Sequence, residues 1–68
     1  MFENQFKFAE QLKLQYGTAL LSKGQAAKEL SVSKATIDRM RLSEEITSQK
    51  VGSQIRFNVK EIARIVMK

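Results

Sequence analysis

The side chains with the clearest chemistry in this 68-residue sequence form two basic, hydroxyl-bearing groups, at positions 33–41 and 50–56. Guanidinium, ammonium, hydroxyl and amide groups donate hydrogen bonds to phosphate oxygens and to base edges. Both groups are therefore typical of a surface that binds a nucleic acid. The candidate binding residues are Ser33, Lys34, Thr36, Arg39 and Arg41 from the first group and Lys50, Ser53, Gln54 and Arg56 from the second.

The distribution of charge agrees with this assignment. The net charge is +5, from twelve Lys and Arg against seven Asp and Glu. Residues 1–21 carry no net charge, whereas 22–43 carry +3 and 44–68 carry +2. A face that binds a polyanion requires such a bias, although a merely solvated basic surface is an alternative that charge alone leaves open.

Residues 22–43, which carry the first group, are predicted to form a helix-turn-helix. Ser22-x-x-Gln25 is a capping-box pattern, and after a short break Ser33 is a good N-cap for a further helix that ends near position 42. In this motif the first helix and the turn brace the second helix, so that its polar face enters the major groove. A scaffold of two packed helices is the alternative interpretation. The side chains expected to face inward are Ala26, Ala27, Leu30, Val32, Ile37, Met40 and Leu42.

The second group lies on a predicted hairpin over 47–57. Its strands are expected at 47–51 and 54–57, because Gly52 suits the first central position of a tight turn. Such a hairpin would grip a phosphate backbone or a minor groove. The apolar residues expected to cover the core are Val51, Ile55 and Phe57.

A last helix is expected at 58–67. Asn58-x-x-Glu61 repeats the capping pattern at its start. Its apolar side is expected to consist of Ile62, Ile65 and Val66.

A family resemblance runs from Leu20 to Val66. It rests on Leu21-Ser22-x-x-Gln25-Ala26-Ala27-x-x-Leu30-x-Val32-Ser33-x-x-Thr36-Ile37-x-Arg39 and on Lys50-Val51-Gly52-x-x-Ile55-Arg56-Phe57. These residues resemble the winged helix-turn-helix domains of phage excisionases, AlpA-like phage regulators and MerR-like regulators. The resemblance implies a mainly α fold with a small β-hairpin, preceded here by an extra N-terminal helix. It also implies sequence-specific binding of double-stranded DNA without catalysis, in an excisionase or a transcriptional regulator.

The sequence departs from this family at two connections. Ser31 stands at the turn where the family often has Gly, and Glu44-Glu45-Ile46-Thr47 replaces a Gly-Leu-Pro-like bend before the wing. The orientation of the wing therefore does not follow from the resemblance.

The N-terminal segment 2–16 reads as an amphipathic helix, followed by Gly17 and an extended or turn segment at 18–21. The helix has two interpretations. It is either a cap over the core or a surface for self-association or a protein partner, through Phe2, Phe6, Phe8 and Leu12. The second interpretation makes the chain a protein–protein adaptor. The sequence argues against an RNA-binding module, because such modules stack bases on aromatic side chains and only Phe57 lies near the basic groups.

The residue inventory excludes several kinds of site. The sequence has no Cys and no His, which argues against disulfides, zinc sites and ordinary acid–base catalysis. Glu44 and Glu45 are adjacent carboxylates without a His, Lys or metal partner, so we interpret them as a solvated loop. We expect no catalytic residue, no metal, no cofactor and no enzymatic activity.

The length fits one small domain, expected to span 1–68. No apolar run approaches the about 18 residues that read as a membrane span. Met1 is not followed by the basic and apolar regions of a signal peptide. We therefore expect a cytoplasmic protein without a membrane partner, associated with the nucleoid when it binds DNA.

Overall fold

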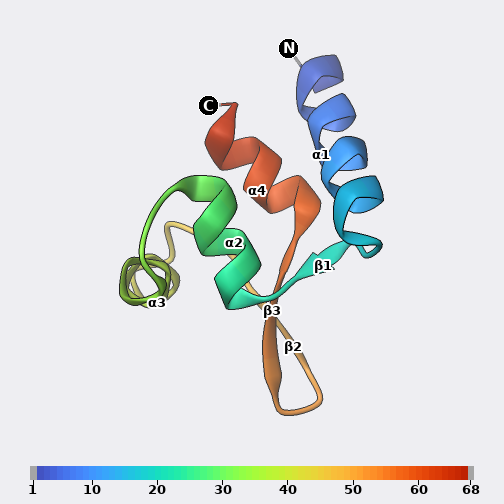
Figure 1. Ribbon diagram of the computed structural model, residues 1–68. Helices are drawn as coiled ribbons and strands as arrows, with labels where there is room; N and C mark the ends of the chain where they lie inside the picture. The colour runs from blue at the N-terminus through green and yellow to red at the C-terminus, as the bar shows by residue number, and fades with distance from the viewer. Residues whose placement is uncertain (1, 68) are drawn as a thin grey trace.

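The computed structural model describes residues 2–67, and their side chains from Asn4 onward. Four helices and a small antiparallel sheet make up this part of the chain (Figure 1). The elements are α1 (Phe2–Tyr16), β1 (Leu20–Leu21), α2 (Lys23–Leu30), α3 (Lys34–Leu42), β2 (Gln49–Val51), β3 (Gln54–Asn58) and α4 (Val59–Val66). The expected winged helix-turn-helix with an additional N-terminal helix is confirmed.

The two helices of the helix-turn-helix begin at the predicted caps. The Ser22 hydroxyl accepts from the backbone N–H of Gln25, and the Gln25 side chain accepts from the N–H of Ser22, which completes the capping box. Ser33 accepts from the N–H of Thr36 at 3.1 Å. Each cap satisfies an amide that the helix leaves unbonded, which stabilises a helix by about 1 kcal/mol.

The cap of α4 differs from the prediction in one partner. Asn58 caps the helix by accepting from the N–H of Lys60 at 2.8 Å. Glu61 was expected to complete the capping box, but its carboxylate accepts from Arg64 and from the backbone of Thr47. The contact with Thr47 comes from a distant loop and cannot be read from the local spacing.

Helices α2 and α3 both end in a left-handed residue that is not glycine. Ser31 follows α2 with φ 57°, and Glu44 follows α3 with φ 62°. In each case the next N–H reaches back to the helix, from Val32 to Ala27 O and from Glu45 to Met40 O. Both ends are therefore Schellman turns, in which glycine is the residue without a steric penalty.

The sheet has the order β1-β3-β2. The predicted hairpin forms β2 and β3, with Gly52 at φ +64° in its turn. Segment 18–21 is extended at Leu20 and Leu21, which pair with Asn58 and Phe57 of β3. This pairing ties the chain before the helix-turn-helix to the inner strand of the wing.

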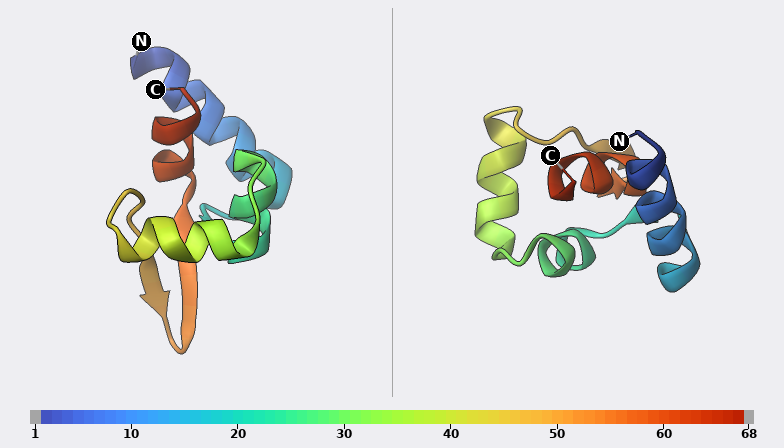
Figure 2. Two further views of the ribbon diagram at one scale, coloured as in Figure 1. Left: turned by 90° about the vertical axis from the view of Figure 1, so that its left-hand side faces the viewer. Right: turned by 90° about the horizontal axis from the view of Figure 1, so that it is seen from above.

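The core is built from every helix and from β1 and β3. Helix α1 packs along α4 (Figures 1 and 2). Tyr16, at the end of α1, donates a hydrogen bond to Glu29 of α2. The buried apolar residues are Ala9, Leu12, Leu21, Ala26, Ala27, Ile37, Ile46, Phe57, Val59, Ile62 and Ala63. Since Ala9 and Leu12 belong to this core, α1 covers the winged helix as one of the two interpretations predicted.

Three apolar side chains expected in the core are exposed instead. Leu42 is 76% exposed because it lies two positions after Met40, which places it on the opposite side of α3. Val51 is 50% exposed because it pairs with Gln54, on the face of the hairpin opposite to Ile55. Val66 is 41% exposed at the last residue of α4, where the helix runs beyond the core.

Candidate nucleic-acid interface

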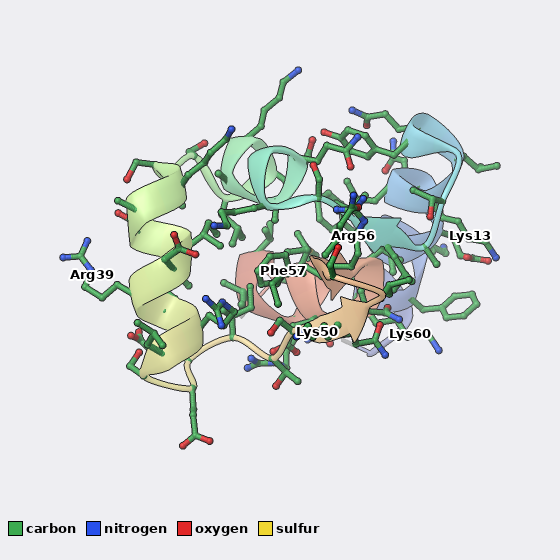
Figure 3. All side chains as sticks on the ribbon, turned by 90° about the horizontal axis from the view of Figure 1, so that it is seen from below. Lys13, Arg39, Lys50, Arg56, Phe57 and Lys60 are labelled. Atoms are coloured by element: carbon green, nitrogen blue, oxygen red, sulfur yellow. The ribbon has the colours of Figure 1, made fainter. Side chains whose placement is uncertain are left out.

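Helix α3 carries a hydrogen-bonded row of polar side chains on its outer face. The hydroxyls of Ser33 and Thr36 lie 3.0 Å apart, and Arg39 donates to the Thr36 hydroxyl at 3.1 Å. The spacing of three residues stacks them along one side of the helix. Arg39 is exposed and extends away from the body of the molecule (Figure 3). The hydrogen bonds join these side chains into one arrangement, in which the guanidinium of Arg39 stays exposed.

Lys34, at the first position of α3, is exposed and lies against α2. A Cβ added at Gly24 would come within 3.3 Å of the Lys34 Cε. The absence of a side chain at Gly24 therefore leaves room for the stem of Lys34, which keeps an ammonium group at the start of the row.

Asp38 and Arg41 take part in contacts that join α3 to α2. The carboxylate of Asp38 accepts from Lys23 of α2, with N–O distances of 2.9 and 3.1 Å. This hydrogen bond, more than any other contact, lowers the pKa of Asp38 below its usual 3.8. Arg41 lies 3.7 Å from the same carboxylate and is only 31% exposed. The structure thus directs Arg41 to the brace between α2 and α3 and does not bring it into the row of Arg39.

The wing carries the second group of candidates. Lys50, Ser53 and Gln54 are exposed, and Arg56 is half-buried. Gln54 accepts a hydrogen bond from Arg56, and the two side chains share a face because they are two residues apart on β3. The other face of β3 places Phe57 in the core. One face of β3 therefore anchors the hairpin in the core, and the other face presents polar side chains away from the core.

The two groups lie on separate projections of the molecule. The hairpin β2–β3 projects beyond the body, and α3 stands to one side of it, roughly crosswise to the direction of the hairpin (Figures 1 and 2). Viewed along the hairpin, Arg39 stands on one side while Lys50 and Arg56 lie on the wing (Figure 3). Four of the cationic side chains in these two groups form no ion pair with a residue that the structure describes: Lys34, Arg39, Lys50 and Arg56.

The connection between α3 and β2 is held by residues that sequence reasoning did not single out for this purpose. Glu61 of α4 accepts from the backbone N–H of Thr47 at 2.7 Å, and Arg64 donates to the carbonyl of Glu45 at 3.2 Å. The hydrogen bonds from Arg64 are the main cause of a pKa of Glu61 below its usual 4.5. The spacing of Glu61 and Arg64 marks an ion pair on one helix, but nothing local indicates the loop that it binds.

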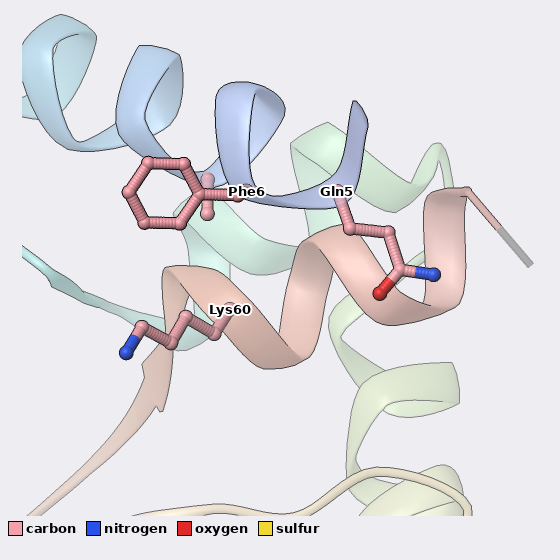
Figure 4. Close-up of a pocket in the computed structure, with 4 residues that line it drawn as sticks. Gln5, Phe6 and Lys60 are labelled. Atoms are coloured by element: carbon pink, nitrogen blue, oxygen red, sulfur yellow. The ribbon is translucent and has the colours of Figure 1, made fainter. Parts of the chain in front are cut away.

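Part of the partner surface predicted on α1 packs against the core of the protein. Leu12 is 1% exposed and Phe8 packs partly against the core, whereas the side chain of Phe2 lies outside the described residues. Phe6 is 60% exposed and lines a pocket of about 260 Å³ with Gln5, Ala9 and Lys60 (Figure 4). This pocket lies between α1 and α4.

Comparison with known proteins agrees with the geometry. The family model described as "Helix-turn-helix domain" matches residues 20–68, which begin at β1 and leave out α1. The chain belongs to the helix-turn-helix domain family. The match covers the braced helices, the wing and α4, and it supports a DNA-binding domain of the excisionase and AlpA-like type. A search of curated proteins and a search of solved structures each found no match.

No helix within residues 2–67 has both the length and the apolar composition needed to span a membrane. The same described residues contain no group of three or more acidic side chains placed to hold a metal ion.

Proposed function

We propose that this helix-turn-helix protein binds a specific duplex DNA sequence, with α3 in the major groove and the wing on the flanking backbone or minor groove. It acts as an excisionase or transcriptional regulator of the phage or mobile-element type, in the cytoplasm and on the nucleoid. The observation that carries the proposal is the outer face of α3, where Arg39 is exposed and oriented by Thr36. The brace to α2 does not involve this exposed row, whereas a helix that enters a major groove presents such side chains to the base edges.

The proposal assigns base contacts to α3 and phosphate contacts mainly to the wing. Arg39 and Lys34 are suited to guanine or phosphate oxygens, and Ser33 to either. Lys50, Ser53 and Arg56 are suited to the backbone beside the recognition site, with Gln54 orienting Arg56. Thr36 acts through Arg39, and Arg41 contributes from the edge of the interface. About four to six phosphate contacts give a slope of log K against log salt of about −4 to −5.

The test begins with selection of bound duplexes from a random pool. Affinity for a selected duplex is then measured by fluorescence anisotropy over a series of NaCl concentrations, for the wild type, Arg39→Ala and Arg56→Ala. Lys7→Ala is the matched control, because it removes one exposed cation from α1.

Arg56→Ala and Arg39→Ala are expected to change different quantities. Arg56→Ala reduces the magnitude of the salt slope by about 1 on every duplex, since it removes a phosphate contact. Arg39→Ala weakens the selected duplex by about 1–3 kcal/mol and relaxes the choice of base, since it removes a base contact. Lys7→Ala leaves both quantities near the wild-type values. Equal binding of duplex DNA, duplex RNA and a neutral polymer would refute the proposal.

A second function, a protein–protein adaptor, is favoured by one observation. Phe6 is 60% exposed and lies beside Lys60 at a pocket on the face formed by α1 and α4. On this alternative, Phe6→Ala abolishes binding of a protein partner while Arg39→Ala and Arg56→Ala leave it intact. The DNA-binding proposal expects Phe6→Ala to leave duplex affinity unchanged.

A further inference from the structure

The segment that joins α3 to β2 must set the distance and angle between the two proposed DNA-binding elements. It runs from Ser43 to Ser48 and contains neither Gly nor Pro, the residues that usually shape such a connection. Its conformation therefore depends on contacts made elsewhere in the fold.

Three contacts place the middle of this segment. Ile46 is 2% exposed and enters the core, which anchors the segment at one point. On either side of it, the carbonyl of Glu45 accepts from Arg64 at 3.2 Å, and the N–H of Thr47 donates to Glu61 at 2.7 Å. The two side chains therefore bond the backbone on both sides of the buried Ile46.

The two side chains also hold each other. Arg64 donates to Glu61 through Nε at 2.8 Å and through Nη2 at 2.9 Å, so the guanidinium and the carboxylate meet as a planar, two-bond pair. The Glu61 side chain is only 15% exposed, and both residues lie on α4, which packs into the core. The pair therefore supports the loop from α4, and the Schellman turn bonds the start of the loop to α3 through the N–H of Glu45 and the carbonyl of Met40.

We propose that Glu61 and Arg64 are positioning residues for DNA binding, which set the wing relative to α3 by holding the backbone of Glu45 and Thr47. This inference rests on the proposed function. Without the pair, the wing samples other orientations, and binding must then select one of them at a cost in affinity. The expected loss is about threefold to tenfold for a loosened loop.

Charge alone predicts the opposite change in DNA affinity when Glu61 is replaced. Replacing Glu61 by Ala or Gln removes a negative charge from a protein that binds a polyanion, which by itself strengthens binding. Glu10→Gln is the matched control, since Glu10 is an exposed carboxylate on α1. The sign of the effect therefore separates positioning from charge.

The experiment measures affinity and salt slope on the selected duplex for the wild type, Glu61→Ala, Glu61→Gln and Glu10→Gln, with circular dichroism to verify folding. We expect Glu61→Ala to bind about threefold to tenfold more weakly with an unchanged salt slope, because no phosphate contact is lost. Glu61→Gln keeps an acceptor for Thr47 and falls between Glu61→Ala and the wild type. Glu10→Gln binds equally or more tightly.

Two results overturn the inference while leaving the proposed function in place. One is duplex affinity of Glu61→Ala equal to or above that of the wild type. The other is a fast-exchanging Thr47 amide in the wild-type protein, which needs no variant to fold and would show that the loop is not held. A wild type that does not prefer duplex DNA refutes the proposed function instead.

Discussion

The two left-handed helix ends provide a test of the backbone conformation itself. Glu44 adopts φ 62° after α3, and Ser31 adopts φ 57° after α2. A residue with a Cβ pays about 1–2 kcal/mol in this region. Glycine avoids that cost but loses about 0.4–1 kcal/mol through the greater freedom of its unfolded chain. Each substitution to Gly is therefore expected to raise the free energy of unfolding by about 0.5–1 kcal/mol.

Urea denaturation followed by circular dichroism measures this change, and thermal unfolding should show a rise of roughly 2–8 °C for each site. Glu44→Ala is the control for charge, because it removes the carboxylate from the negative end of α3 but retains the Cβ. Gln11→Gly is the control for glycine, since Gln11 is exposed in the middle of α1, where Gly costs about 1 kcal/mol.

The outcome depends on the contrast between these variants. Glu44→Gly must be more stable than Glu44→Ala, and Ser31→Gly more stable than Ser31→Ala, while Gln11→Gly is less stable than the wild type. A Gly variant no more stable than its Ala counterpart would show that the left-handed conformation carries no strain at that end, and the reasoning would be wrong.

Three further predictions concern acid, the wing turn and the core. The pKa values of Glu61 and Asp38 lie below their usual 4.5 and 3.8. The ionised carboxylates therefore stabilise the fold fully at a pH above those usual values, and this stabilisation is lost as the pH falls through the lower folded-state pKa. Unfolding free energy should decrease in this acid range, less steeply in Glu61→Gln, and parallel curves would contradict the assignment. Gly52→Ala should destabilise by about 1 kcal/mol in urea because φ is +64° there, and an unchanged midpoint would exclude this strain. Ile37→Ala should cost about 2–5 kcal/mol, since Ile37 is fully buried, and a loss under 1 kcal/mol would contradict the packing.

Local patterns predicted most of the elements because the interactions behind them are local. The caps at Ser22 and Ser33 join side chains to amides three residues away, and Gly52 suits its own turn whatever surrounds it. Ser31, at the turn where the similar family often has Gly, adopts the left-handed conformation that glycine favours. Local reasoning was wrong about Leu42, Val51 and Val66. Leu42 and Val51 lie on the faces opposite to Met40 and Ile55, and Val66 ends α4 beyond the core.

The candidate site was predictable as a set of residues but not as an arrangement. Spacing on the helix grouped Arg39 with Arg41, but the structure places Arg39 in the exposed row and Arg41 beside the Lys23–Asp38 brace. That brace joins residues fifteen positions apart, so no local pattern contains it.

The sequence by itself determined the helix starts, the hairpin turn, the basic groups at 33–41 and 50–56, and the family resemblance. These depend on spacing and on side-chain chemistry within a few residues. Only the tertiary structure decided that α1 covers the core, that Leu20–Leu21 pairs with β3, and that α4 holds the loop before the wing. The physical reason is that such contacts join distant residues, whose proximity depends on how all the apolar faces pack together.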